Sequence, residues 1–155
     1  MELSKYQNIQ VKEYDINSEV SYTLLQELSE KLQRITGSSG EANFNKKDVE
    51  GDKSLFVVAT LENEPIGCGS LREIDGYTAE VKRMYARYSG IGIGGKILNY
   101  LSKQAKIFGY TALLCETRKI NTVAVTFYLK SGFKRIENYG IYKGRDDAVC
   151  FQKIL

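Results

Sequence analysis

The chain of 155 residues is long enough for one domain with a buried core and too short for two domains of ordinary size. Its 22 basic and 19 acidic residues give a formal charge of +3 and are spread along the sequence, which argues against a nucleic-acid partner. Because the sequence has neither a membrane-spanning apolar run nor a signal-peptide pattern, we expect a cytoplasmic protein with no membrane partner.

The sequence contains no histidine, which removes the commonest general base, the commonest metal ligand and every Ser-His or Cys-His nucleophile pair. Proton transfer must then use Glu, Asp, Tyr, Cys, Lys or water, and we expect no metal. Cys68, Cys115 and Cys150 each lie in an apolar run, so we interpret them as reduced thiols of the core.

The first half of the chain predicts a strand at residues 9–14 and an antiparallel hairpin of strands at 55–61 and 66–74. Between them, residues 36–53 are rich in Gly, Ser, Asn, Asp and Lys and predict a loop with at most one short helix. Asn17 or Ser18 caps a preceding amphipathic helix, whose apolar residues recur at helical spacing: Val20, Leu24, Leu28, Leu32 and Ile35.

A strand at residues 78–86 leads into a glycine-rich loop at residues 89–95 and then into a helix. The apolar stripe of that helix comprises Ile93, Ile97, Leu98, Leu101, Ala105 and Phe108. This succession of strand, glycine loop and helix is the central unit of the sequence.

The remaining segments are a buried strand at 112–117, a helix capped by Asn121, and strands at 133–138 and 148–155. Antiparallel strands come early and a β-α-β crossover comes late. The order predicts an α/β protein of the mixed α+β kind, with one mixed sheet and helices on both of its faces.

The glycine loop places side-chain-free amides at a helix N-terminus, where N–H groups and the helix dipole favour an anion such as a pyrophosphate. The alternative is a turn whose glycines only let helix and strand pack closely. The loop also fits dinucleotide and methyltransferase patterns, and Glu116 lies where a ribose-binding carboxylate would be. However, residues 80–86 are half polar, unlike the continuous apolar central strand of those folds.

Residues 121–133 read N-x-x-A-x-x-F-Y-x-x-x-G-F, and with the segments from Phe56 to Leu155 in this order the chain resembles the GNAT superfamily of N-acetyltransferases. The resemblance implies a single GNAT domain over residues 1–155, with a mostly antiparallel sheet and a V-shaped splay between its two middle strands. It also implies direct transfer, in a ternary complex, from acetyl-CoA to a primary amine of a small molecule or peptide.

The resemblance further implies how acetyl-CoA is bound. Strand 78–86 would hydrogen-bond the pantetheine and supply a backbone N–H to the oxyanion, and residues 90–96 would hold the pyrophosphate. The expected acetyl-CoA contacts are Met84, Tyr85, Ala86, Gly90, Ile91, Gly92, Ile93, Gly94, Gly95, Lys96, Glu116, Asn121, Ala124, Phe127 and Tyr128. One departure is Ser89, where the family usually has Arg or Gln, so Arg87 or Lys96 would supply the missing charge.

Tyr128 corresponds to the family's tyrosine that protonates the departing thiolate, and the alternative is a ring that only packs. Glu80, on the strand that would face the thioester, is the candidate general base, with Glu116 in reserve. The alternative for Glu80 is a solvated or salt-bridged side chain paired with Lys82 or Arg83.

The acceptor site is less clearly encoded. A pocket for an amine that also bears a carboxylate could use the side chains of Arg72, Arg118, Tyr139, Tyr142 and Arg145, since Arg binds carboxylates through a bidentate fork. A solvated surface position is the alternative for each of them.

Residues 36–40 would either cover the acceptor or merely connect helix to strand. Two other functions stay open from the residues alone: an S-adenosylmethionine-dependent methyltransferase and a non-catalytic CoA-binding regulator. A homodimer is also left open.

Overall fold

The computed structural model describes residues 8–155, and its seven strands form one sheet in the order β1-β2-β3-β4-β5-β7-β6. The strands are β1 (Gln10–Glu13), β2 (Leu55–Leu61), β3 (Glu64–Asp75), β4 (Thr78–Ala86), β5 (Ala112–Arg118), β6 (Lys134–Ile136) and β7 (Ala148–Ile154). The α-helices are α2 (Glu19–Thr36), α3 (Ile93–Ile107) and α4 (Thr122–Lys130), and the 3-10 helices are η1 (Glu41–Asn43), η2 (Lys46–Val49) and η3 (Gly140–Tyr142). The predicted mixed sheet is confirmed.

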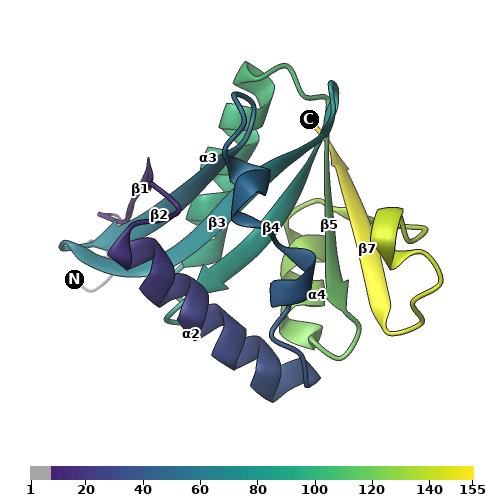
Figure 1. Ribbon diagram of the computed structural model, residues 1–155, viewed down its shortest axis with the longest axis horizontal. Helices are drawn as coiled ribbons and strands as arrows, with labels where there is room; N and C mark the ends of the chain where they lie inside the picture. The colour runs from purple at the N-terminus through teal and green to yellow at the C-terminus, as the bar shows by residue number, and fades with distance from the viewer. Residues whose placement is uncertain (1–7) are drawn as a thin grey trace.

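Helices cover both faces of the sheet, with α2 in front and α3 behind in Figure 1. Because side chains alternate along a strand, β2 packs against helices on both faces of the sheet. Phe56 and Val58 pack in the cluster that contains Leu24 of α2, whereas Leu55 and Val57 pack in the cluster that contains Ile97 of α3. No helix within residues 8–155 combines the length and the apolar character needed to cross a membrane.

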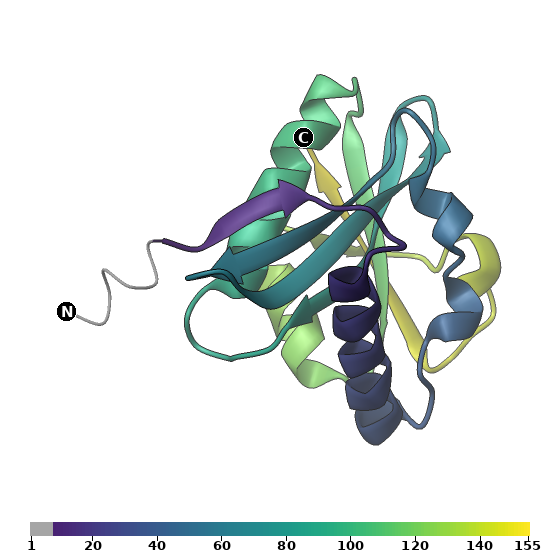
Figure 2. The same ribbon diagram turned by 60° about the vertical axis from the view of Figure 1, so that its left-hand side comes forward.

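Helix α2 begins at the predicted cap and ends at a glycine. The Ser18 hydroxyl accepts a hydrogen bond from the backbone N–H of Ser21 at 3.2 Å, and Gly37 follows the helix in the left-handed conformation, with φ of 78°. The segment after it holds two 3-10 helices, η1 and η2, where the sequence predicted at most one short helix. Figure 2 shows α2 lying across the sheet.

The predicted splay between the two middle strands is confirmed. β4 and β5 are the only parallel neighbours in the sheet of residues 8–155, and they pair only at Thr78–Glu80 opposite Ala112–Leu114. Beyond Glu80 the strands diverge and form the V of Figure 1, whose open end faces α4.

The three cysteines are confirmed as core residues. Cys68, Cys115 and Cys150 are free thiols, and each is fully buried. Burial raises the pKa of the Cys68 thiol to about 12, so this side chain stays a neutral thiol at physiological pH.

Candidate active site

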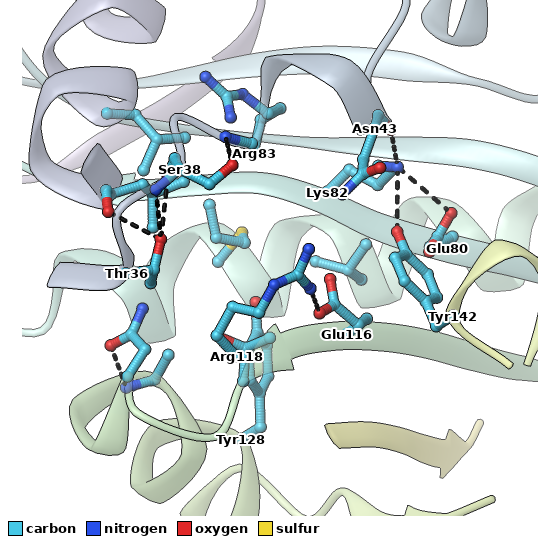
Figure 3. Close-up of a pocket in the computed structure, with 18 residues that line it drawn as sticks. Thr36, Ser38, Asn43, Glu80, Lys82, Arg83, Glu116, Arg118, Tyr128 and Tyr142 are labelled. Carbon is cyan, nitrogen blue, oxygen red and sulfur yellow. Dashed lines mark hydrogen bonds and ion pairs between the residues drawn. The ribbon is translucent and has the colours of Figure 1, made fainter. Parts of the chain in front are cut away.

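A cleft, here called the central cleft, opens where β4 and β5 diverge (Figure 3). Lys82 and Met84 of β4 form one wall, Glu116 and Arg118 of β5 form another, and Tyr128 of α4 lies at its base. Helix α2 and the segment after it close the cleft on the side opposite α4. Six of the predicted catalytic and acetyl-CoA-contact residues line this cleft: Glu80, Met84, Glu116, Asn121, Ala124 and Tyr128.

The edge of β4 that faces this cleft is open. On its other side β4 continues to pair with β3 as far as Ala86, but beyond Glu80 no strand of residues 8–155 pairs with it on the β5 side. Such an edge offers N–H and C=O groups to an extended ligand, which can add to it as a strand would. Met84 lines the cleft, whereas the Tyr85 hydroxyl donates to Glu27 Oε1 of α2 at 2.9 Å.

The glycine loop leads from β4 to α3 at the open end of the cleft. Gly90 and Gly92 have φ of 80° and 83°, a left-handed conformation that favours glycine, and Gly92 is the N-cap of α3. The first helical hydrogen bond runs from Lys96 N to the Gly92 carbonyl at 3.0 Å. The N–H groups of residues 93–95 have no acceptor among residues 8–155, so they are free to bind an anion, as the loop hypothesis requires.

Arg87 and Lys96 are the two residues that could replace the polar side chain missing at Ser89 in the expected pyrophosphate site. Arg87 is engaged elsewhere, because its guanidinium donates to Glu27 Oε2 of α2 at 2.6 Å and to Glu64 Oε2 at 3.2 Å. Lys96 is exposed in the first turn of α3 and forms no ion pair within the described residues 8–155. Lys96 is therefore the better candidate for contact with a phosphate.

The N-terminal half of α4 borders the cleft. The Asn121 side-chain oxygen accepts from Ala124 N at 3.3 Å, which confirms the predicted cap, and both residues line the cleft. Phe127 lies instead against α3: a Cβ atom at Gly94 would come within 3.1 Å of its ring. Phe127 and Gly94 thus set the distance between the two helices.

The position of Tyr128 is compatible with both alternatives, since its ring packs in the core and the residue also lines the cleft. Its side chain is only 7% exposed, and its ring packs edge-on against Phe127 and Phe133 at centroid distances of 5.2 and 5.4 Å. It also lines the cleft, and its hydroxyl has no hydrogen-bond partner among residues 8–155. Burial raises the pKa of Tyr128 well above its usual value, so the phenol stays protonated and able to donate.

Glu80 is neither solvated nor paired with Arg83, so that part of the alternative is wrong. Its side chain is 1% exposed, and Arg72 donates to Oε1 from Nε at 3.0 Å and from Nη2 at 2.8 Å. The Tyr139 hydroxyl donates to Oε2 at 2.6 Å, and Lys82 Nζ lies 3.8 Å from Oε1. Both carboxylate oxygens are therefore already bound by donors.

Glu116 forms the second buried acid of the cleft. It is bound by Arg118, and the two side chains are 9% and 12% exposed. Burial raises the pKa of Glu116, and the Arg118 charge opposes this rise. Figure 3 shows both side chains beside Tyr128.

A second hollow, here called the side groove, adjoins the central cleft. Arg72, Tyr139 and Tyr142 line it, as the acceptor hypothesis expected, and none of the three is a solvated surface residue. Lys82 and Asn43 line both hollows, and Lys82 Nζ donates to the Asn43 carbonyl and to the Tyr142 hydroxyl (Figure 3). These contacts form a partition between the two.

The other two predicted acceptor residues lie apart from the side groove. Arg118 lines the central cleft. Arg145 has a 42% exposed side chain that donates to Asp147 at 3.1 Å, and it borders neither hollow, as its surface alternative expected. No local sequence pattern predicts the partition, because Asn43 lies in an irregular segment whose path over β4 depends on tertiary contacts.

Residues 21–133 match a family model described as the acetyltransferase (GNAT) family. An IAA acetyltransferase of Azospirillum brasilense is 30% identical over 139 residues, which cover 82% of this chain and 87% of that protein.

Solved structures resemble the whole fold. An acetyltransferase from Streptococcus agalactiae has a TM-score of 0.74 at 23% identity, covering 96% of this chain and 99% of that one. A GNAT family acetyltransferase from Elizabethkingia anophelis, solved with acetyl-CoA bound, has a TM-score of 0.72 at 21% identity, with coverage of 96% and 99%.

Proposed function

The chain belongs to the acetyltransferase (GNAT) family and is an acetyl-CoA-dependent N-acetyltransferase, and we propose that its acceptor is a small-molecule primary amine that also carries a carboxylate. One observation carries the catalytic assignment: the β4 to β5 pairing stops at Glu80, which opens a cleft lined by Tyr128, and β4 then leads to the unpaired N–H groups at the start of α3. A methyltransferase of the dinucleotide-fold type would need a parallel sheet, whereas only one pair of neighbouring strands within residues 8–155 is parallel.

The open edge of β4 supports an extended binding mode for the pantetheine arm, with the thioester in the central cleft and the pyrophosphate at residues 93–95. The acceptor nitrogen forms a bond to the acetyl carbon, and the carbon–sulfur bond breaks. A backbone N–H of β4 stabilises the oxyanion, and Tyr128 donates its hydroxyl proton toward the departing sulfur.

The acceptor ammonium must first lose a proton, and the geometry supports Glu116 for this step better than Glu80. Both oxygens of Glu80 accept hydrogen bonds, Oε1 from Arg72 and Oε2 from Tyr139, so neither is open to the acceptor ammonium. Glu116 has a raised pKa and lines the same cleft as Tyr128, so we propose that it takes the proton, directly or through water.

The charges around the two hollows support an acidic acceptor. Among the described residues that line them, four are cationic, namely Arg72, Lys82, Arg83 and Arg118, and three are anionic, namely Asp48, Glu80 and Glu116. Glu80 and Glu116 are each bound by an arginine, so an arginine charge offsets each carboxylate charge, which disfavours a polycationic acceptor. Arg72 is 33% exposed at the side groove, where its remaining N–H groups can bind a carboxylate.

The test is a thiol-release assay with matched amines: an amino acid, the amide of the same amino acid, and a polyamine such as spermidine. A carboxylate contact predicts a kcat/KM at least about tenfold higher for the acid than for its amide, since a charged hydrogen bond contributes about 1.5–3 kcal/mol. Equal values for acid and amide, or fastest turnover with the polyamine, would contradict the acceptor class while leaving the acetyl transfer itself intact.

A further inference from the structure

Arg83 adopts an unusual backbone conformation in the middle of β4, at the wall of the central cleft. Its φ is 53°, and the other non-glycine residues of the described chain with positive φ, Glu62 and Asn63, lie in a hairpin turn. The β3 register shifts at the same point, from Lys82 opposite Ser70 to Tyr85 opposite Cys68. Three steps along β4 thus oppose two along β3, which is a bulge.

A left-handed arginine costs about 1–3 kcal/mol and persists only where its surroundings enforce it. In this structure the Arg83 guanidinium is held by hydrogen bonds to α2 and to the segment after it. Nη2 donates to the Ser29 hydroxyl at 2.6 Å and to the Leu25 carbonyl at 3.4 Å, both on α2, and Nη1 donates to the Ser39 carbonyl at 3.1 Å. The ring of Phe44 lies 5.9 Å from the guanidinium carbon.

The Arg83 charge is compensated only at longer range, by Glu41, which lines the same surface hollow. Its guanidinium forms no ion pair with any carboxylate of residues 8–155, and its Nε is buried without an acceptor. A partly buried cation without an ion pair is costly, as the lowering of the Arg83 pKa by burial also indicates. A structure that needed only packing at this position would be better served by an apolar side chain.

The anchors of Arg83 lie on elements that border the cleft. Leu28 and Leu32 of α2, and Ser38 and Gly40 after it, line the central cleft. Gly40 lies so close that a Cβ there would come within 3.1 Å of Arg83 Nη1. The guanidinium therefore fixes the β4 bulge relative to the wall of α2 and residues 38–40.

We propose that Arg83 is a positioning residue for acetyl transfer, which holds the β4 bulge so that the backbone N–H groups after it face the thioester carbonyl. The inference rests on the proposed binding of the thioester in the central cleft. It gives one purpose to the strained backbone and to the cation that has no ion pair within residues 8–155: a rigid hydrogen-bond donor and a positive potential next to the carbonyl oxygen.

The experiment uses acetyl-CoA labelled with ¹³C at the acetyl carbonyl, because the resonance of the bound carbonyl reports its polarisation without an acceptor. For the parent protein we expect a downfield shift of this resonance on binding. In Arg83→Asn the residue still tolerates positive φ but lacks the guanidinium, and we expect at least half of the shift to be lost while the Kd for acetyl-CoA changes less than threefold.

Ser29→Ala removes one anchor, leaves Arg83 in place and should lose part of the shift, so it decides the question if Arg83→Asn does not fold. Ser21→Ala is the matched control: Ser21 is also buried on α2, but its hydroxyl bonds the Asp15 carbonyl, and the carbonyl shift should be unchanged. A full shift in folded Arg83→Asn, or in Ser29→Ala if the first variant does not fold, overturns the proposal. Failure of the parent to bind acetyl-CoA would instead contradict the proposed function.

Discussion

Tyr128 presents its hydroxyl to the central cleft while three phenylalanine rings hold its own ring in place. Tyr128→Phe keeps that packing, so we expect an unchanged Tm and an unchanged Kd for acetyl-CoA. Turnover should fall by about 10² or more, in the range typical of a lost general acid. The measurement is single-turnover thiol release. A parent-like rate would leave Tyr128 with a packing role alone.

The dependence of kcat/KM on pH in variants of Glu116 and Glu80 shows which of the two carboxylates is the general base. Because burial raises the pKa of Glu116, its basic form is populated only as pH rises through that value, and this form should carry the low-pH limb of turnover. Glu116→Gln should lose turnover at neutral pH and regain part of it at alkaline pH, where more of the acceptor is neutral. We would measure kcat/KM from about pH 6 to pH 10. A profile parallel to the parent's at equal height would contradict this role.

Glu80→Gln is the companion variant and should behave differently. It leaves Arg72 and Lys82 without their carboxylate, so the free energy of unfolding should fall by roughly 2–4 kcal/mol, somewhat below a fully buried pair because Arg72 is one-third exposed. Its pH profile should keep the parent's shape. A loss of turnover with alkaline recovery and no loss of stability would return the base to Glu80.

At the scale of elements, the start of α3 offers a test of phosphate binding. A Cβ at Gly95 meets no atom within 4 Å, and replacing a helical glycine by alanine usually stabilises a helix by about 0.5–1 kcal/mol. Gly95→Ala should therefore raise the Tm of the free protein, and the same Cβ should weaken acetyl-CoA binding if the pyrophosphate approaches this backbone. Calorimetry measures both effects. A higher Tm with a Kd within twofold of the parent would exclude the helix start as the phosphate site.

The ion pair between Glu27 of α2 and Arg87, the residue after β4, should make the free energy of unfolding depend on pH. The hydrogen bond from Arg87 holds the pKa of Glu27 below its ordinary value of 4.5. This contribution is therefore present above the unfolded pKa and is lost as pH falls through the lower folded pKa. In Glu27→Gln the loss of Tm on acidification below about pH 4.5 should be smaller than in the parent. Glu30→Gln, an exposed change on the same helix, should keep the parent's acid dependence.

At the scale of the whole molecule, strands β2 and β4 have the bounds that the sequence predicted, because their alternation and flanking turns are local signals. The pairing of Arg72 with Glu80 was not predictable in this way. A register shift between Glu73 and Asp75 moves the β3 and β4 partners by one residue, and such a slip changes every pair that follows it. The anchors of Arg83 lie more than forty positions away in the sequence, where no local pattern connects them.

The central claim is that the diverging strands bind acetyl-CoA along β4 with its thioester near Tyr128, and a crystal structure of the complex tests it most directly. The claim predicts the pantetheine hydrogen-bonded to the β4 backbone beyond Glu80, the pyrophosphate at the N–H groups of residues 93–95, and the sulfur within about 4 Å of the Tyr128 hydroxyl. A thioester in the side groove, or a pyrophosphate away from the start of α3, would contradict it.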